Sequence, residues 1–122
     1  ARIGTSGWHY LHWQGSYYPP SVPPQAMLDC NARDLDTIEI NKALAAAFIG
    51  HIRRVERFDA SRVLFAVKGS RYLTHQKKLL DPGPALKRLL SVAGHLGPKL
   101  GPILFQLPPH WGFNLERLSR FL

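Results

Sequence analysis

The chain has 122 residues, of which 45% are hydrophobic and 20% charged, with a formal net charge of +8. This composition excludes an intrinsically disordered chain, and the length suffices for one compact domain. The positive charge favours phosphates or acidic surfaces as partners, although a merely soluble basic protein has the same balance. The single cysteine, Cys30, excludes an internal disulfide. With no signal peptide and no spanning apolar run, we expect a cytoplasmic protein without a membrane partner.

The first predicted strand, residues 2–6, leads into an unusually aromatic loop. Gly7 ends the strand, and three aromatic residues and two histidines follow within six positions, between Trp8 and Trp13. Each of these rings needs a surface to pack against. We therefore expect residues 8–24 to form an irregular loop at one end of a sheet. The rings are either a stacking platform for a ligand or a hydrophobic plug.

Strands and helices alternate in the remainder of the chain. Apolar runs predict further strands at residues 36–41, 63–69 and 100–107. Apolar residues at helical spacing predict helices at about 24–35, 43–58, 81–96 and from 114 onward.

The third helix and the second strand carry the clearest patterns. Asp81-Pro82 is expected to cap that helix. Alternation in residues 36–41 places Glu39 and Asn41 on one face of the strand. The expected buried positions of the last two helices are Leu86, Leu89, Leu90, Ala93, Leu96, Leu115, Leu118 and Phe121.

Four strand–helix units predict an α/β fold with a parallel sheet and right-handed crossovers. Four units are half of an eight-fold barrel, so we predict a TIM-barrel-like half barrel in which residues 1–122 form a single domain. Half a barrel leaves edge strands and apolar surface uncovered. We therefore expect either a piece of a longer protein or a chain that associates with itself through these edges.

Short motifs recur along the whole chain, namely Gly4-Thr5-Ser6-Gly7-Trp8, Tyr10, Trp13, Gly15, Tyr18-Pro19, Glu39-Ile40-Asn41, Phe65-Ala66-Val67-Lys68, Thr74-His75, Leu96-Gly97 and Leu104-Phe105-Gln106-Leu107-Pro108-Pro109. In order and spacing these motifs resemble those of the YecE-like family, a bacterial and archaeal domain of unknown function. The resemblance covers the whole chain and implies the first half of a TIM-barrel-like domain. One departure is Lys42-Ala43-Leu44-Ala45, where the family has a small residue and then Phe-Tyr.

Candidate site residues follow from this topology, because functional groups of barrels gather at the carboxyl ends of the strands. We predict Glu39 as general base or ligand, Lys68 as anion holder and His75 as a third catalytic group. A structural ion pair between Glu39 and Lys68 is the alternative. The predicted ligand-binding residues are Ser6, Trp8, His9, Asn41, Arg71, Tyr72 and Gln106.

The ligand class rests on charge. Between Lys68 and Arg88 there are six lysines or arginines against one acidic residue. Such a cluster with interleaved rings is typical of a phosphate-bearing or nucleic-acid ligand, and the alternative is a solvated basic surface.

Histidines raise a weaker metal hypothesis. The four that bear on it are His9, His12, His75 and His110, and a metal site is not our prediction. Cofactor and reaction are left unassigned. The alternatives to a catalytic anion-binding site are a non-catalytic nucleic-acid-binding module and an inactive structural fragment.

Overall fold

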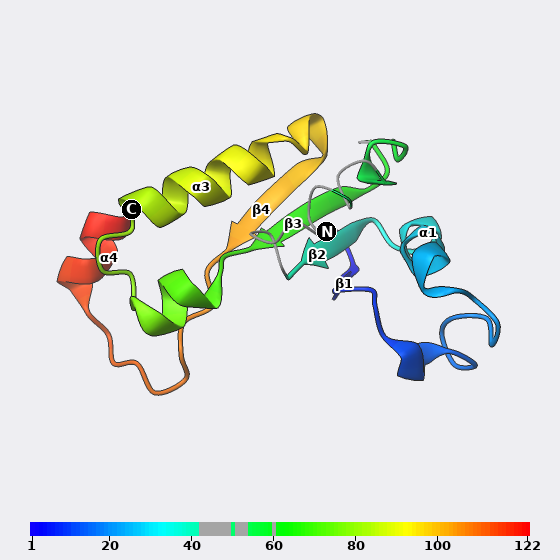
Figure 1. Cartoon of the computed structure of the whole chain (residues 1–122), viewed down its shortest axis with the longest axis horizontal. Helices are drawn as coiled ribbons and strands as arrows, with labels where there is room; N and C mark the ends of the chain where they lie inside the picture. The colour runs from blue at the N-terminus through cyan, green and yellow to red at the C-terminus, as the bar shows by residue number, and fades with distance from the viewer. Residues whose placement is uncertain (42–49, 51–53, 60) are drawn as a thin grey trace.

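The computed structural model describes residues 1–41, 50, 54–59 and 61–122. Within this part of the chain the four strands form one parallel sheet in the order β1-β2-β3-β4 (Figure 1). Sheet order therefore follows chain order, as expected for successive strand–helix units. The strands are β1 (Gly4–Ser6), β2 (Thr37–Ile40), β3 (Leu64–Lys68) and β4 (Leu100–Leu104).

Helices connect these strands and confirm the α/β prediction. Helix α1 (Met27–Asp34) links β1 to β2, α3 (Gly83–Gly94) links β3 to β4, and α4 (Leu115–Phe121) follows β4. A π-helix, η3 (Tyr72–Gln76), follows β3. The helix predicted at 43–58 lies largely outside the described residues, and Val55, one of its predicted inward positions, is buried. Residues 42–45, where the sequence departs from the family motif, also lie outside the described residues.

One face of the sheet is buried and the other is partly open. Ile38, Ile40, Phe65 and Val67 are at most 2% exposed and belong to the main hydrophobic core. Their neighbours in β2 and β3 are only partly buried. The alternation of β2 thus places its isoleucines in the core and Glu39 on the open face, as predicted.

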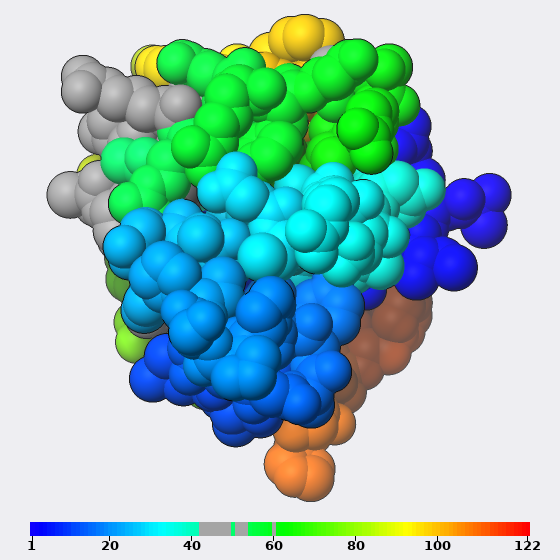
Figure 2. Space-filling model, turned by 90° about the vertical axis from the view of Figure 1, so that its right-hand side faces the viewer, coloured from blue at the N-terminus to red at the C-terminus, as the bar shows by residue number. Residues whose placement is uncertain are grey.

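The aromatic loop packs closely on this core. Figure 2 shows the loop after β1 and helix α1, coloured blue through cyan, as one continuous surface. Trp8 and Tyr18 are 7% and 2% exposed. The Tyr18 hydroxyl donates to the Trp8 carbonyl at 2.7 Å, and the buried Asn31 amide donates to that hydroxyl at 3.3 Å. The buried ring of Trp8 agrees with the plug interpretation of this loop.

The fourth strand ends earlier than the predicted residue 107. Leu104 is the register partner of Lys68, the last residue of β3, so later residues have no neighbouring strand to pair with. The β3–β4 register also shifts between Phe65 and Val67, opposite Pro102. Proline has no N–H to donate to the ladder, which explains the irregularity.

Three predictions about the last two helices are wrong. Asp81 does not cap α3: its φ is +43°, and Pro82 occupies the cap position. A proline disfavours the helical region for the residue before it, which explains the displaced start. Leu90 and Leu115 are 53% and 62% exposed. Leu90 lies beside the buried stripe of Leu89 and Ala93 in α3, whereas α4 has no fully buried residue.

The start of α4 agrees with the sequence. The Asn114 side chain accepts from the Arg117 backbone N–H at 2.9 Å, which is an N-cap. Among the described helices, none combines the length and the apolar character needed to cross a bilayer.

Candidate functional site

Polar side chains from three neighbouring strands meet at the carboxyl edge of the sheet. Ser6 and Glu39 are register partners across β1 and β2, and Glu39 is in turn the partner of Ala66 in β3. Lys68 lies two residues beyond Ala66, so it shares the open face with Glu39. Parallel topology alone therefore brings these three residues together.

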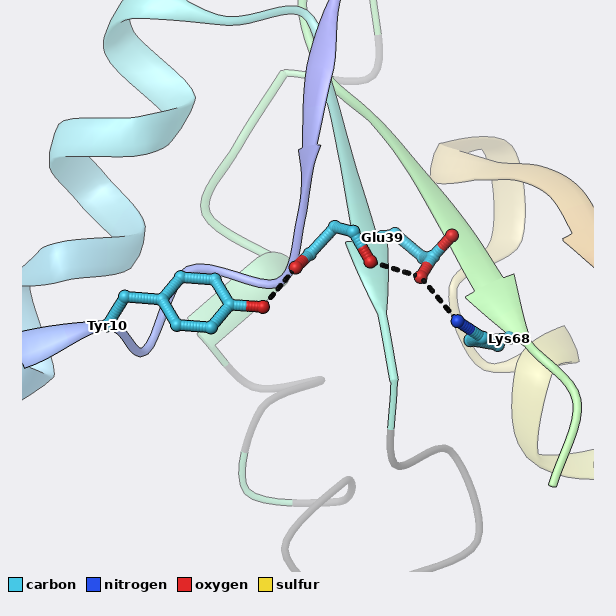
Figure 3. Close-up of polar contacts among 4 residues, drawn as sticks. Tyr10, Glu39 and Lys68 are labelled. Carbon is cyan, nitrogen blue, oxygen red and sulfur yellow. Dashed lines mark hydrogen bonds and ion pairs between the residues drawn. The ribbon is translucent and has the colours of Figure 1, made fainter. Parts of the chain in front are cut away.

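Contacts link the three side chains through one oxygen. The Ser6 hydroxyl donates to Glu39 Oε1 at 2.6 Å, and Lys68 Nζ lies 3.7 Å from the same oxygen (Figure 3). The Glu39 side chain is 15% exposed and that of Lys68 is 28% exposed. Both charges are thus partly shielded from water and still reachable by a ligand.

Tyr10 completes this group, although the sequence alone predicts it only as one ring of the aromatic loop. Its hydroxyl donates to the Ser6 carbonyl (Figure 3). Gly7, with φ of +86°, turns the chain between the two residues. The one feature of the sequence that indicates this contact is Gly7, which directly follows Ser6 and precedes Tyr10 by three residues. We call Ser6, Tyr10, Glu39 and Lys68 the edge cluster.

Asn41 lies beside the edge cluster at the end of β2. A Cβ on Gly7 would lie 3.2 Å from the Asn41 amide nitrogen and 2.9 Å from the Tyr10 hydroxyl oxygen. Gly7 thus leaves room for both polar groups. Asn41 itself is exposed, so its amide is accessible to a ligand.

The other predicted site residues are not joined to the edge cluster. Within the described residues, no hydrogen bond or ion pair connects His75 to Glu39 or Lys68; its Nδ1 instead lies 2.9 Å from the Thr74 hydroxyl. Tyr72 is 50% exposed at the start of η3, and Lys77 Nζ lies 6.0 Å from its ring centroid. His9, Arg71 and Gln106 are exposed, and Trp8 is buried.

A metal site finds no geometric support in the described part of the chain. No three histidine, cysteine, aspartate or glutamate side chains there gather closely enough to hold an ion. His12 instead packs near the Tyr10 ring, with centroids 5.6 Å apart. His12 thus takes part in the ring packing of the aromatic loop.

The edge cluster offers two complementary functions. Lys68 has three N–H donors and, within the described part of the chain, one carboxylate partner, so donors are left for an anion. Glu39 accepts at Oε1, and no hydrogen bond from a described residue reaches its other oxygen. That oxygen can accept a proton from a ligand hydroxyl or water, which is what a general base does.

The comparisons with known proteins give a family and no activity. The model of a family described as a protein of unknown function, DUF72, matches residues 2–122. The chain belongs to this family. The match confirms the YecE-like resemblance drawn from the motifs. No curated protein and no solved structure matches this DUF72 chain.

Proposed function

We propose that this DUF72 chain binds a phosphate-bearing ligand at the edge cluster. The observation that carries the proposal is the sharing of Glu39 Oε1 between the Ser6 hydroxyl and the Lys68 ammonium, at the carboxyl edge of a parallel sheet. Ligands of α/β sheets bind beyond this edge. Lys68 contacts the phosphate as a point charge, and the Asn41 amide donates a hydrogen bond. Ser6, whose single hydroxyl proton is donated to Glu39, lines the site and holds that carboxylate in place.

Glu39 is the proposed acid–base group if the ligand is also hydrolysed. Its free oxygen faces the partly open side of the sheet, where a water or ligand hydroxyl can lie within hydrogen-bond reach. His75 and Arg71, from the segment after β3, are proposed as further contacts to a ligand long enough to reach them. The structural alternative is that the Glu39–Lys68 pair only stabilises the sheet edge.

Binding of ribose 5-phosphate, with unphosphorylated ribose as control, tests the proposal by calorimetry. We expect Lys68→Met to weaken binding of the phosphorylated sugar at least about tenfold, because a charged hydrogen bond is lost. Lys87→Met removes an exposed lysine of α3 and is expected to change little. Equal losses in the two variants, or no binding by the parent chain, would contradict the proposal.

Glu39→Gln separates the acid–base role from binding. The substitution keeps the shape of the side chain and removes its ability to take a proton. We expect phosphate-ester hydrolysis, if the parent chain shows it, to be lost while ribose 5-phosphate still binds. Loss of folding instead, seen by circular dichroism, would assign the pair a structural role.

A specific observation favours nucleic acid as a second candidate ligand. The exposed Tyr72 ring lies beside Lys77, and Arg71 and Lys78 are exposed in the same segment. Stacking on such a ring contributes about 1–3 kcal/mol per base. Tyr72→Ala would then weaken binding of a single-stranded oligonucleotide, which should also fall steeply with salt and be insensitive to Glu39→Gln.

A further inference from the structure

A cavity of about 330 Å³ lies between the turn that follows η3 and helix α4. Both elements lie beyond the carboxyl ends of β3 and β4 (Figure 1). The volume is near the lower end of the roughly 300–1,000 Å³ typical of small-molecule sites. The carbons of Leu79, Leu80 and Pro82 form part of its wall, so the cavity suits a small ligand with an apolar portion.

Four charged side chains line the same cavity, and only two of them satisfy each other. Arg120 Nη2 lies 2.9 Å from Glu116 Oε1. Arg117 is partly buried and donates only a long bond, 3.4 Å, to the Lys78 carbonyl. No ion pair among the described residues joins Asp81 to Arg117 or to another cation. The cavity therefore has one uncommitted negative group and one uncommitted positive group.

The turn that carries Asp81 is held in a costly backbone conformation. Lys78, Leu79 and Asp81 have φ values of +47°, +63° and +43°. Such values are uncommon for residues other than glycine and concentrate at functional sites. The Leu79 amide donates to the Leu73 carbonyl at 3.0 Å, and the Leu79 side chain is buried. Contacts with η3 thus fix the turn, and with it the place of Asp81 on the cavity wall.

We propose that this cavity binds a small zwitterion of the amino-acid type with an apolar side chain. The Arg117 guanidinium pairs with the carboxylate, because its planar fork matches two carboxylate oxygens. The Asp81 carboxylate pairs with the ammonium. The apolar side chain covers Leu80, which is 45% exposed, and contacts Pro82.

L-leucine is the probe, titrated into the whole chain and followed by amide NMR shifts. We expect shifts at residues 78–81 and 114–120 with a dissociation constant of about 1 mM or lower. Two analogues each lack one charge: 4-methylpentanoate has no ammonium, and 3-methylbutylamine has no carboxylate. Both should bind at least about tenfold more weakly, because each leaves one charged partner unmet.

Matched variants assign the two charges. Asp81→Asn keeps a residue that tolerates positive φ and removes only the charge, and Arg117→Gln removes the guanidinium. Both should reduce leucine affinity at least about tenfold. The double variant Glu116→Gln with Arg120→Gln removes the satisfied pair at constant net charge and should change affinity less than about twofold. Absence of leucine shifts, or equal binding of 4-methylpentanoate and leucine, overturns the proposal.

Discussion

Gly4 in β1 shows how one missing side chain permits the sheet. A Cβ at this position would lie 1.9 Å from the Thr37 carbonyl oxygen of β2, a distance that no real contact allows. We expect Gly4→Ala to destabilise the fold by about 1–3 kcal/mol, because β1 must move away from its partner. Urea unfolding followed by tryptophan fluorescence measures this loss.

Gly112→Ala is the matched control for Gly4→Ala. Apart from the adjoining residues of the chain, no described atom lies within 4 Å of the position that a Cβ on Gly112 would take. The substitution should change the unfolding free energy by less than about 0.5 kcal/mol. Equal unfolding midpoints for the two variants would show that β1 does not pair as described.

Ionisation of the buried Tyr18 phenol is expected to lower the stability of the fold at alkaline pH. Burial raises the pKa of the Tyr18 phenol above its usual 10.0, and the neutral hydroxyl donates to the Trp8 carbonyl. The pKa of Tyr18 is therefore higher in the folded chain than in the unfolded chain. The stability that the neutral, buried phenol contributes is complete below pH 10 and is lost as the pH rises through the folded pKa. Melting temperatures between pH 8 and 11 should therefore fall less steeply in Tyr18→Phe than in the parent.

The Tyr18→Phe variant should also be less stable than the parent at pH 8, by about 1 kcal/mol for the lost hydrogen bond. Tyr72→Phe, which removes the hydroxyl of a half-exposed ring, is the matched control for the loss of one phenol. An unchanged slope in Tyr18→Phe would remove Tyr18 as the cause.

Helix α3 tests burial at the scale of one element. Leu89 is 1% exposed and Leu90 is 53% exposed, although the two are adjacent and chemically identical. We expect Leu89→Ala to cost about 2–5 kcal/mol, because it leaves a cavity against the core. Leu90→Ala should cost less than about 0.5 kcal/mol. Thermal unfolding distinguishes them, and similar losses would mean that α3 is rotated from the described orientation.

The same helix shows where sequence patterns stop being informative. Leu86, Leu89 and Ala93 define a stripe by their spacing, but the width of that stripe depends on what the helix meets. The spacing of apolar residues alone does not show that Leu90 lies outside the buried stripe. Likewise Asp81 has the composition of a cap, but its φ of +43° lies in the left-handed region. The following proline disfavours the right-handed helical conformation at Asp81, and the sequence pattern does not show which other conformation the residue takes.

Across the whole molecule, topology was predictable and loop geometry was not. Alternating strands and helices predicted a parallel sheet, and that arrangement alone placed Ser6, Glu39 and Lys68 at one edge. The contact of Tyr10 with Ser6 depends on the turn at Gly7, and the place of His75 depends on a π-helix. Neither has a periodic signature in sequence. The cavity at Asp81 and Arg117 joins segments that no spacing relates.

Self-association is the prediction that belongs to the whole chain. In the described sheet β1 and β4 each pair on one side only, and Leu104 on β4 is 44% exposed. A second copy can extend such parallel edges and cover this leucine. Net charge of +8 opposes contact between two copies, so association should strengthen as salt screens the repulsion. Sedimentation velocity at two salt concentrations measures this trend, which is opposite to that of nucleic-acid binding.

Two leucine variants locate the contact between copies. Leu104→Lys should shift the chain toward monomer, whereas Leu90→Lys on α3 should not. A monomer at every protein and salt concentration would exclude the prediction.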